Sequence, residues 1–329
     1  MTQINTVAVI GLGSIALRHR RNLKQTYTSA TVLAMSASGR IPEQEVACAD
    51  YIVSDIQSLI AAKPFMVIVA SPSTLHAEHS IPLLEAGIPV LIEKPICATS
   101  SDALALTKAA ERYNTALSVG YCLRYLSSAV EMKLLLDTKC IGTLYNVQAD
   151  VGQFLPEWRA DTEYKNSVSA SAALGGGALL ELSHELDYIQ WLVGELKLNY
   201  GQVRNSSELD LEVEELADLV LTNKAGCVCY VHLDFLQKQP HRHCHFIGSQ
   251  GRLNWDLLNN NIILHSANGT QTLYSEPEWD KNQMYLAMVD DFVRQITGQS
   301  HRCVTLKEAV TTVQLIEQIK QQAERGSKQ

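Results

Sequence analysis

A glycine-rich turn stands near the start of the chain, where Gly11, Gly13 and Ala16 follow the spacing Gly-x-Gly-x-x-Ala. The first glycine of such a turn makes the tight bend, the second admits a pyrophosphate, and the third position needs a small residue for helix packing. The β-branched run 6–10 precedes the turn and a basic segment, 17–23, follows it, which is the setting that the pattern requires. We therefore expect a bound dinucleotide rather than a turn without a ligand. The expected contacts are Gly11, Gly13, Ser14 and Ile15.

The end of the next predicted strand bears on the kind of dinucleotide. An NAD-binding domain commonly places Asp or Glu about 20 residues after the turn, where it holds the ribose 2′-hydroxyl. Residues 34–40 read Ala-Met-Ser-Ala-Ser-Gly-Arg and contain no acid. Hydroxyl groups and a guanidinium pair with a 2′-phosphate that a carboxylate would repel. Ser36, Ser38 and Arg40 therefore predict a preference for NADP(H), with NAD(H) as the alternative if Arg40 is an ordinary surface residue.

Lys94 is the first candidate for proton transfer. It follows the apolar run 90–92 and so lies at the carboxyl edge of the predicted sheet, where open α/β folds bind ligands, and Pro95 ends the strand. Hydride transfer at a hydroxyl or ketone leaves a proton to be moved at the same oxygen, and a partly desolvated ammonium can supply it. The alternative is a surface lysine.

A second set of candidates follows the glycine run 175–177, where Glu181, His184 and Asp187 succeed one another at intervals of three. Residues three apart on one helix share a face, so Glu181 and His184 are expected to reach one pocket. A histidine suits proton exchange near neutral pH because its unperturbed pKa is about 6.5. We expect His184 to be catalytic or substrate-binding and Glu181 to be a further catalytic candidate, although a lone helical histidine is more often structural.

An irregular segment before the glycine run carries residue types that suit sugars. Trp158 and Tyr164 offer aromatic faces for sugar C–H surfaces, and Arg159 can hold a carboxylate or phosphate by two hydrogen bonds. These residues predict either a site for an anionic sugar, such as a uronic acid, a nonulosonic acid or a nucleotide sugar, or simply a packed loop.

Strands and helices alternate over the first 121 residues, which implies parallel crossovers in one doubly wound sheet. The expected strands are 6–10, 30–35, 66–70, 90–92 and 116–119, and the helices 17–23, 75–86 and 101–113. Beyond residue 121, strands separated by turn signals indicate a mostly antiparallel open sheet. These strands are 144–151, 214–222, 227–236, 241–247, 252–255, 262–265 and 270–274, with helices at 127–136, 179–192, 284–296 and 306–323. We expect an α/β protein with a Rossmann domain, 1–121, and a substrate-binding and oligomerisation domain, 122–329, whose C-terminal helix can pack back on the first.

Charge and composition exclude other classes of protein. The 329 residues contain 27 Lys and Arg against 35 Asp and Glu, for a net charge of −8, which argues against nucleic-acid binding. Residues 1–42 nevertheless hold five basic residues and no acid, so an anion is expected near the N-terminus. No apolar run approaches the roughly 20 residues of a membrane helix, and no secretory signal is recognised. The eight cysteines form no C-x-x-C pair, so a cytoplasmic protein with reduced cysteines follows.

Three alternating histidines, His241, His243 and His245, point to one face of a predicted strand and suggest a metal ion. Nothing supplies a fourth ligand or a second shell, and hydride chemistry with a lysine acid needs no metal. We expect a solvated or interface-facing strand and no metal.

Four further segments carry a family resemblance: 11–19, 71–78 (Ser-Pro-Ser-Thr-Leu-His-Ala-Glu), 85–95 with its Glu93-Lys94-Pro95, and 120–125. Together they resemble the glucose-fructose oxidoreductase and inositol dehydrogenase family (Gfo/Idh/MocA). The resemblance implies a Rossmann domain followed by an α/β domain with an open sheet, and NAD(P)-linked oxidation or reduction of a sugar-like hydroxyl or ketone. It implies that Lys94 donates the proton while Glu93 orients or tunes it. The other implied contacts are Ser71, Pro72, His76, Glu93 and Lys94 for the cofactor, and Tyr121, Arg124 and Asp187 for the substrate, besides Trp158, Arg159 and Tyr164.

The segment after the glycine run departs from the family pattern. The family has an acid, a catalytic histidine four residues later and an Asp three after that, whereas here the acid is Glu181 and His184 follows by three. We expect an oxidoreductase acting on a sugar or sugar derivative, with a surface-polysaccharide pathway as a suggestion. The alternatives are an NADP-binding regulatory protein without turnover and a family member that recycles a tightly bound cofactor. A homodimer or homotetramer is expected, because an open sheet face otherwise leaves apolar surface in water.

Overall fold

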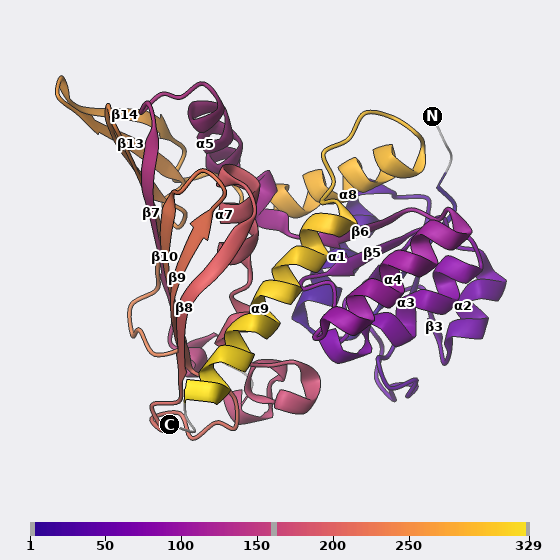
Figure 1. Ribbon diagram of the computed structural model, residues 1–329. Coiled ribbons are helices and arrows are strands. Elements are labelled where there is room, and N and C mark those ends of the chain that lie inside the picture. Colours follow the sequence, from indigo (N-terminus) through magenta and orange to yellow (C-terminus); the bar gives the residue numbers. More distant parts are fainter. Residues whose placement is uncertain (1–3, 159–162, 327–329) are drawn as a thin grey trace. The chain divides into compact units, whose positions relative to one another are not determined.

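The structure is a computed structural model that describes residues 4–158 and 163–326 (Figure 1). By internal contacts the chain divides into two compact units, the first formed by residues up to 121 together with 285–313, and the second by 122–284 together with the residues from 314 on. The domain bounds expected from the sequence, 1–121 and 122–329, stay a prediction. The expected contiguous second domain, 122–329, differs from this division because residues 285–313 belong to the first unit.

The first unit is built on a six-stranded parallel sheet with the order β3-β2-β1-β4-β5-β6. The strands are β1 Thr6–Ile10, β2 Thr31–Met35, β3 Tyr51–Val53, β4 Val67–Val69, β5 Val90–Glu93 and β6 Leu117–Gly120. The helices are α1 Ser14–Thr26, α2 Ile56–Ala62, α3 His76–Glu85 and α4 Ser100–Tyr113, with α8 Gln283–Ile296 and α9 Leu306–Gly326 following the second sheet. Strands β4 and β5 are buried along their whole length, as parallel strands covered by helices are. The strand order reverses between β1 and β4, and ligands of open α/β sheets bind at the carboxyl ends of strands at such a point.

Each expected strand and helix of residues 1–121 is present, with ends moved by a few residues. β3 and α2 were not predicted from the sequence. β3 has only three residues and lies at the edge of the sheet, with Tyr51 exposed. It therefore lacks the buried apolar run from which a strand can be predicted. α2 is short and is capped by Asp55, whose side chain accepts a hydrogen bond from the Ser58 N–H at 2.7 Å.

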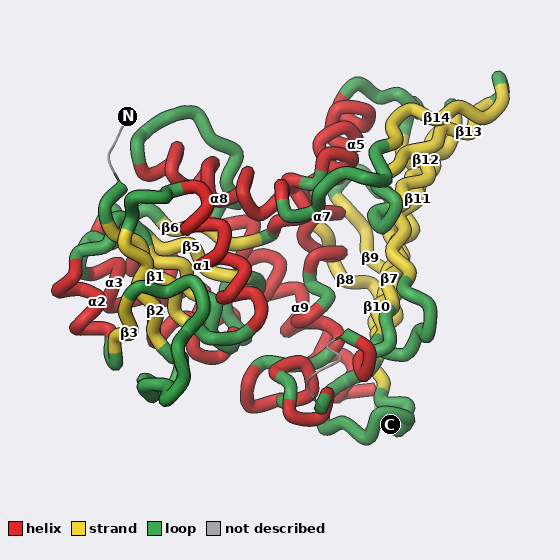
Figure 2. Tube along the Cα trace, turned by 180° about the vertical axis from the view of Figure 1, so that it is seen from behind, coloured by secondary structure: helices red, strands yellow, loops and turns green. Residues whose placement is uncertain are grey.

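The second unit contains an eight-stranded sheet with the order β14-β13-β12-β11-β7-β10-β9-β8, in which only β7 and β10 pair in parallel. The strands are β7 Leu144–Gly152, β8 Leu196–Arg204, β9 Leu216–Asn223, β10 Val228–Asp234, β11 His241–Gly248, β12 Gly251–Asp256, β13 Asn261–Ser266 and β14 Gly269–Ser275. Edge strand β8 was not predicted, because its burial alternates irregularly. The helices are α5 Ser127–Asp137, α6 Ala178–Glu181 and α7 His184–Val193. Figure 2 shows α5 and α7 on one face of this sheet, and no helix of the described chain covers the other face of the second unit's sheet.

The last helix begins as the sequence predicts. Thr305 and Glu308 form a capping box, in which Thr305 Oγ1 accepts the Glu308 N–H at 3.3 Å and the Glu308 carboxylate accepts the Thr305 N–H at 2.9 Å. Among the described residues, no helix is both long and apolar enough to cross a membrane.

Candidate active site

The glycine turn is closed on its inner side and open on its outer side. Gly11 has a φ of +112°, and a Cβ there would overlap the carbonyl of Ala70 at the end of β4. At Gly13, a Cβ would meet no atom within 4 Å. Ala16 is fully buried, as the third position of the pattern requires. The backbone at Gly13 therefore faces space into which a pyrophosphate can come close, so these residues fit a dinucleotide.

The start of helix α1 is suited to an anion. Its first turn contains no acidic residue, and no side chain caps its N-terminus at Gly13. The first N–H groups of a helix lack partners within the helix and lie at the positive end of its dipole. A dinucleotide's phosphates provide both the acceptors and the negative charge that this end lacks.

Three of the five N-terminal basic residues have structural partners instead of an open position for an anion. Arg20 is buried and donates from Nη1 to the carbonyl of Gly11 and from Nε to that of Ala47, both at 3.0 Å. Lys24 pairs with Asp50, and the Arg18 guanidinium lies 4.7 Å from the centre of the Tyr285 ring. Most of the positive charge of residues 1–42 therefore serves contacts within the first unit, which hold the glycine turn and helix α1 in place.

The turn after β2 presents two hydroxyl groups and a guanidinium. Ser36 directly follows β2 and is buried, and its Oγ lies 3.2 Å from that of Ser38. Ser38 and Arg40 are exposed on either side of Gly39, which has a φ of +72°. The polar groups expected to meet a 2′-phosphate thus follow the strand end on one short turn.

His76 joins the loops that follow β4 and β5. Its ring is almost fully buried, with Nε2 2.8 Å from the carbonyl oxygen of Ser71 and Nδ1 3.0 and 3.2 Å from those of Pro95 and Ile96. Burial lowers the pKa of His76 below its usual value, and the carbonyl groups act in the opposite direction. The expected cofactor contact of His76 stays a prediction, but its ring nitrogens are occupied by backbone carbonyls. Ser71 and Pro72, half-buried, lie in the loop that His76 holds.

Lys94 follows β5 and is partly exposed, and its neighbour Glu93 is fixed by two protein groups. One carboxylate oxygen of Glu93 lies 2.6 Å from Nε2 of His19, and the other accepts the backbone N–H of Lys94 at 3.2 Å. Glu93 is 8% exposed. Both oxygens of the Glu93 carboxylate therefore contact protein groups. The predicted role of Glu93 in orienting Lys94 stays a prediction. His19 was not among the residues predicted from the sequence, where its place in the segment 11–19 was the one signal for it.

Glu181 and His184 lie in different helices. The single helix expected over 179–192 is broken at 182–183, so α6 ends at Glu181 and α7 begins at His184. Glu181 and His184 therefore do not share one helical face, and that prediction is wrong. Both residues are half-buried.

The glycine run is required by packing. A Cβ at Gly176 would come within 2.5 Å of the Val168 carbonyl oxygen, and one at Gly177 within 2.5 Å of the Glu214 carboxylate. Gly177 also has a φ of +102°. Glu214 accepts the N–H of Leu179 at 3.2 Å, so its carboxylate occupies the start of α6. The run thus lets the chain pass close to its neighbours before α6 and α7 begin.

Two buried ion pairs fix helix α7. Asp187 accepts two hydrogen bonds from Arg124, at 2.7 and 2.9 Å, and Glu185 accepts two from Arg242, at 2.7 and 2.9 Å. The side chains of Arg124 and Asp187 are 6% and 1% exposed. The substrate contacts expected of Arg124 and Asp187 remain a prediction, but the structure pairs these two groups with each other. They orient the helix on which His184 is the first residue.

The remaining candidates lie in the same unit or at its boundary. Trp158 donates from Nε1 to the carbonyl of Gln153 at 3.1 Å and packs edge-on against Phe235, with the ring centres 5.3 Å apart. Tyr164 donates its hydroxyl to the carbonyl of Leu209 at 3.1 Å. Both aromatic residues thus hold their loop, and Tyr121 is fully buried in the first unit. Arg159 lies outside the described residues.

Comparison with family models places both units. Residues 5–121 match the model described as the oxidoreductase family with an NAD-binding Rossmann fold, and residues 129–254 match the Gfo/Idh/MocA C-terminal domain. The chain belongs to the Gfo/Idh/MocA family of oxidoreductases.

Several relatives of this Gfo/Idh/MocA chain are named as dehydrogenases. It is 32% identical over 200 residues to an inositol 2-dehydrogenase of Saccharopolyspora erythraea, a match that covers 57% of this chain and 54% of the relative. A second inositol 2-dehydrogenase of that organism is 28% identical over 273 residues, which cover 78% and 75% of the two chains. The matched part spans about half the length of the first of these relatives. A structure of levoglucosan dehydrogenase with NADH and L-sorbose has a TM-score of 0.86 at 19% identity, with 98% of both chains covered, and shares the fold.

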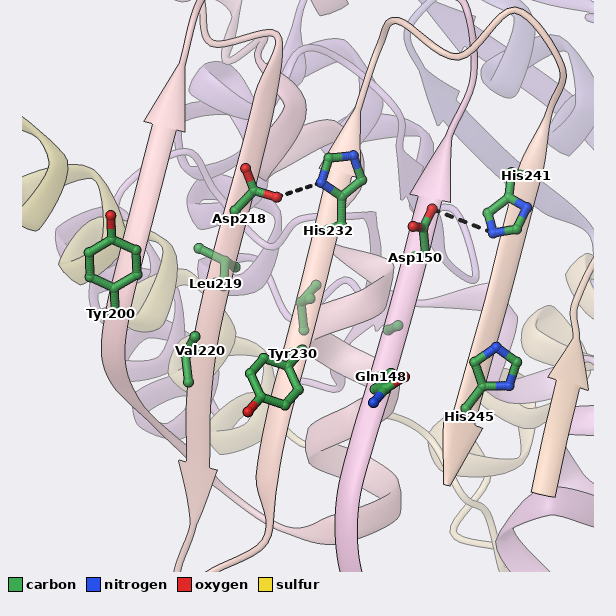
Figure 3. Close-up of a pocket in the computed structure, with 12 residues that line it drawn as sticks. Gln148, Asp150, Tyr200, Asp218, Leu219, Val220, Tyr230, His232, His241 and His245 are labelled. Atoms are coloured by element: carbon green, nitrogen blue, oxygen red, sulfur yellow. Dashed lines mark hydrogen bonds and ion pairs between the residues drawn. The ribbon is translucent and has the colours of Figure 1, made fainter. Parts of the chain in front are cut away.

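The uncovered face of the Gfo/Idh/MocA C-terminal sheet carries an open pocket of about 650 Å³ (Figure 3). On β11, Arg242 contacts Glu185 of α7, so the alternate residues His241, His243 and His245 belong to the opposite face. His241 lies 3.5 Å from Asp150. In the parts of the chain described here, 4–158 and 163–326, no three His, Cys, Asp or Glu side chains gather in a way that could hold a metal ion.

His232 is expected to stabilise the fold only when it is protonated. Its ring lies 2.9 Å from Asp234 and 2.6 Å from Asp218, and these carboxylates, Asp234 first, raise the pKa of His232 to about 9 despite partial burial. Because the folded pKa exceeds that of the unfolded chain, about 6.5, the stabilisation is complete below pH 6.5 and disappears as the pH rises through 9. Unfolding midpoints of wild type and His232→Gln, measured from pH 6 to 10, should therefore converge at alkaline pH. A difference that is independent of pH would refute this assignment.

Proposed function

We propose that this chain is an NAD(P)-dependent oxidoreductase that transfers a hydride between a nicotinamide and the hydroxyl or ketone carbon of a sugar or polyol. The observation that carries the proposal is the position of Lys94. It directly follows β5, in a sheet whose glycine turn is open to a dinucleotide at the same carboxyl edge. The names of relatives, inositol 2-dehydrogenase and levoglucosan dehydrogenase, support this class of substrate.

The residues of the first unit have separable roles in the proposed reaction. NAD(P), when bound, supplies or accepts the hydride. The backbone at Gly11 and Gly13 and the first N–H groups of α1 would hold its pyrophosphate. Lys94 would donate a proton to the ketone oxygen during reduction, and its neutral amine would remove the hydroxyl proton during oxidation. Glu93 holds the Lys94 backbone, and His76 ties the Lys94 turn to the loop after β4.

The second unit contributes His184, proposed as a further proton-transfer or substrate-binding group. Its position at the start of α7 is fixed by the ion pairs of Glu185 and Asp187 farther along the helix. Glu181, at the end of α6, is proposed as a second polar group for the substrate. Either role requires that the alanine variant bind the dinucleotide normally while its turnover falls.

Initial rates on a panel of compounds test the proposed function. The panel contains myo-inositol, levoglucosan, glucuronate and a UDP-linked hexose, each offered with NAD⁺ and with NADP⁺, and the absorbance of the reduced nicotinamide is followed. We expect turnover with at least one compound. A preference for glucuronate or the UDP-sugar would support the anionic substrate that Trp158 and Arg159 suggest. Dinucleotide binding without turnover on this panel, or with the corresponding ketones and reduced cofactor, would favour a regulatory protein instead.

NADP(H) is the proposed preferred cofactor, because Ser36, Ser38 and Arg40 follow β2 where NAD-binding domains commonly carry an acid. Calorimetric titration is expected to show tighter binding of NADPH than of NADH. Arg40→Ala should weaken NADPH binding by about tenfold and leave NADH unchanged, since only the 2′-phosphate pairs with the guanidinium. Arg21→Ala, which removes another exposed guanidinium of the same unit, is the matched control. Tighter binding of NADH would refute this preference.

A homo-oligomer is proposed to form through the uncovered face of the eight-stranded sheet. Tyr200 on β8 and Tyr230 on β10 are large, exposed side chains that line the pocket on this face (Figure 3). Burial of these rings against a second copy would remove apolar surface from water. Sedimentation velocity measures the resulting mass, and a monomer at micromolar concentration would contradict the proposal.

A further inference from the structure

A buried histidine and carboxylate lie next to Lys94 in the first unit. The His19 side chain, on α1, has no exposed surface, and its Nε2 lies 2.6 Å from Oε1 of Glu93, the last residue of β5. The second oxygen of Glu93 accepts the Lys94 N–H at 3.2 Å. A chain of two contacts therefore joins the helix that begins at the glycine turn to the backbone of the proposed proton donor.

The pair is largely enclosed by protein, with the Glu93 side chain 11% exposed. The Tyr285 ring meets His19 edge-on, with the ring centres 6.0 Å apart, and Arg18 lies over the same ring. On the other side, a Cβ at Gly120 would lie 3.3 Å from the Glu93 carboxylate, so the glycine at the end of β6 leaves just enough room for it. The Glu93 carboxylate also acts on His76, whose pKa it raises against the larger, opposite effect of burial. Removing one partner from such a desolvated pair leaves the other buried without compensation.

We propose that His19 is a positioning residue for Lys94: it holds the Glu93 carboxylate against the Lys94 backbone N–H and keeps it from turning toward the Lys94 ammonium. Without His19, no histidine holds Oε1 of Glu93. The carboxylate, one residue before Lys94, can then turn toward the Lys94 ammonium. A nearby carboxylate stabilises an ammonium and so hinders the transfer of its proton. The inference rests on the proposed function only for the role of Lys94 in the reaction.

Competitive labelling tests the inference without a substrate. Lys94 reacts with a trace amount of an amine-reactive reagent over a range of pH, and peptide mass spectrometry measures the extent of its labelling. In His19→Leu the midpoint of the labelling profile is expected to rise by about one pH unit, which makes labelling near neutral pH about tenfold slower. With a substrate from the panel, kcat is expected to fall by about 10- to 100-fold, while KM and dinucleotide affinity stay unchanged.

Three further variants separate positioning from a general loss of structure. His19→Gln keeps an amide N–H that can reach Glu93 and should restore most of the labelling rate and kcat. Arg21→Ala, an exposed change on the same helix, should match wild type. Glu93→Gln removes the charge at nearly constant volume and should be labelled at least as fast as wild type. In its background His19→Leu leaves no buried carboxylate unpaired, so the double variant decides the question even if His19→Leu alone does not fold. Adding His19→Leu to Glu93→Gln should change the labelling no further.

The inference is overturned if folded His19→Leu labels and turns over like wild type, or if adding His19→Leu to Glu93→Gln slows the labelling of Lys94. Failure of the proposed function gives a different pattern. In that case Lys94→Ala would keep full activity, while His19→Leu would still slow the labelling of Lys94.

Discussion

Lys94→Ala is expected to lower kcat by about 1,000-fold while dinucleotide affinity remains that of wild type. General acid or base catalysis by a positioned group contributes about 10² to 10⁴ in rate, and alanine removes the only proposed donor that directly follows the β5 strand. Binding should persist because the groups that receive the pyrophosphate, at Gly11, Gly13 and the start of α1, are untouched. Steady-state kinetics with the active compound of the panel and calorimetry with the dinucleotide measure the two quantities.

Two lysine variants sharpen this test. Lys94→Arg keeps a positive charge but gives up the proton poorly, because a guanidinium is not deprotonated in proteins, so it should be nearly as inactive as Lys94→Ala. Lys108→Ala removes an exposed lysine from α4 and should behave as wild type. Turnover of Lys94→Ala within a few-fold of wild type would exclude Lys94 as the proton donor.

Arg124→Leu is expected to destabilise the protein by about 3–5 kcal/mol. The change leaves the Asp187 carboxylate, 1% exposed, without the guanidinium that donates two hydrogen bonds to it, and breaking a buried pair on one side carries a cost of that order. The start of α7 should become more mobile at the same time, because Asp187 lies in the first turn of this helix. Denaturant unfolding followed by circular dichroism measures the loss.

The double variant Arg124→Leu/Asp187→Leu removes both charges and should recover much of the stability, since a buried pair and an apolar pair of similar volume are often close in free energy. Lys133→Ala, which breaks the exposed pair of Lys133 with Asp137 on α5, is the control and should leave the unfolding midpoint unchanged. A single Arg124→Leu variant as stable as this control would mean that the pair does not hold α7.

The sequence predicts most of the first unit because its strands are buried apolar runs and its turn has a fixed spacing. β4 and β5 are apolar in sequence and buried in the structure. Elements that depend on distant partners were missed. β3 and β8 are edge strands with exposed residues. The sequence suggested only that the C-terminal helix can pack back on the first domain, and the place of the whole stretch 285–313 depends on contacts with residues far away in the chain.

The candidate site shows the same limit. The turn at Gly11 and the position of Lys94 after a strand follow from local sequence. The partners of their neighbours do not, since Glu93 meets His19 across 74 residues and Asp187 meets Arg124 across 63. The break between α6 and α7 was not predicted either. The two residues at the break are Leu182 and Ser183, and neither is a glycine or proline, the residues that commonly mark the end of a helix.

Transfer of deuterium tests the proposed hydride chemistry most directly. The compound that the panel identifies is prepared with deuterium on its carbinol carbon and incubated with oxidised cofactor, and mass spectrometry follows the label. The account predicts that deuterium passes from carbon to the reduced nicotinamide with wild type and, at equal time, is almost absent with Lys94→Ala. Release of the deuterium into water, or equal transfer by both proteins, would contradict it.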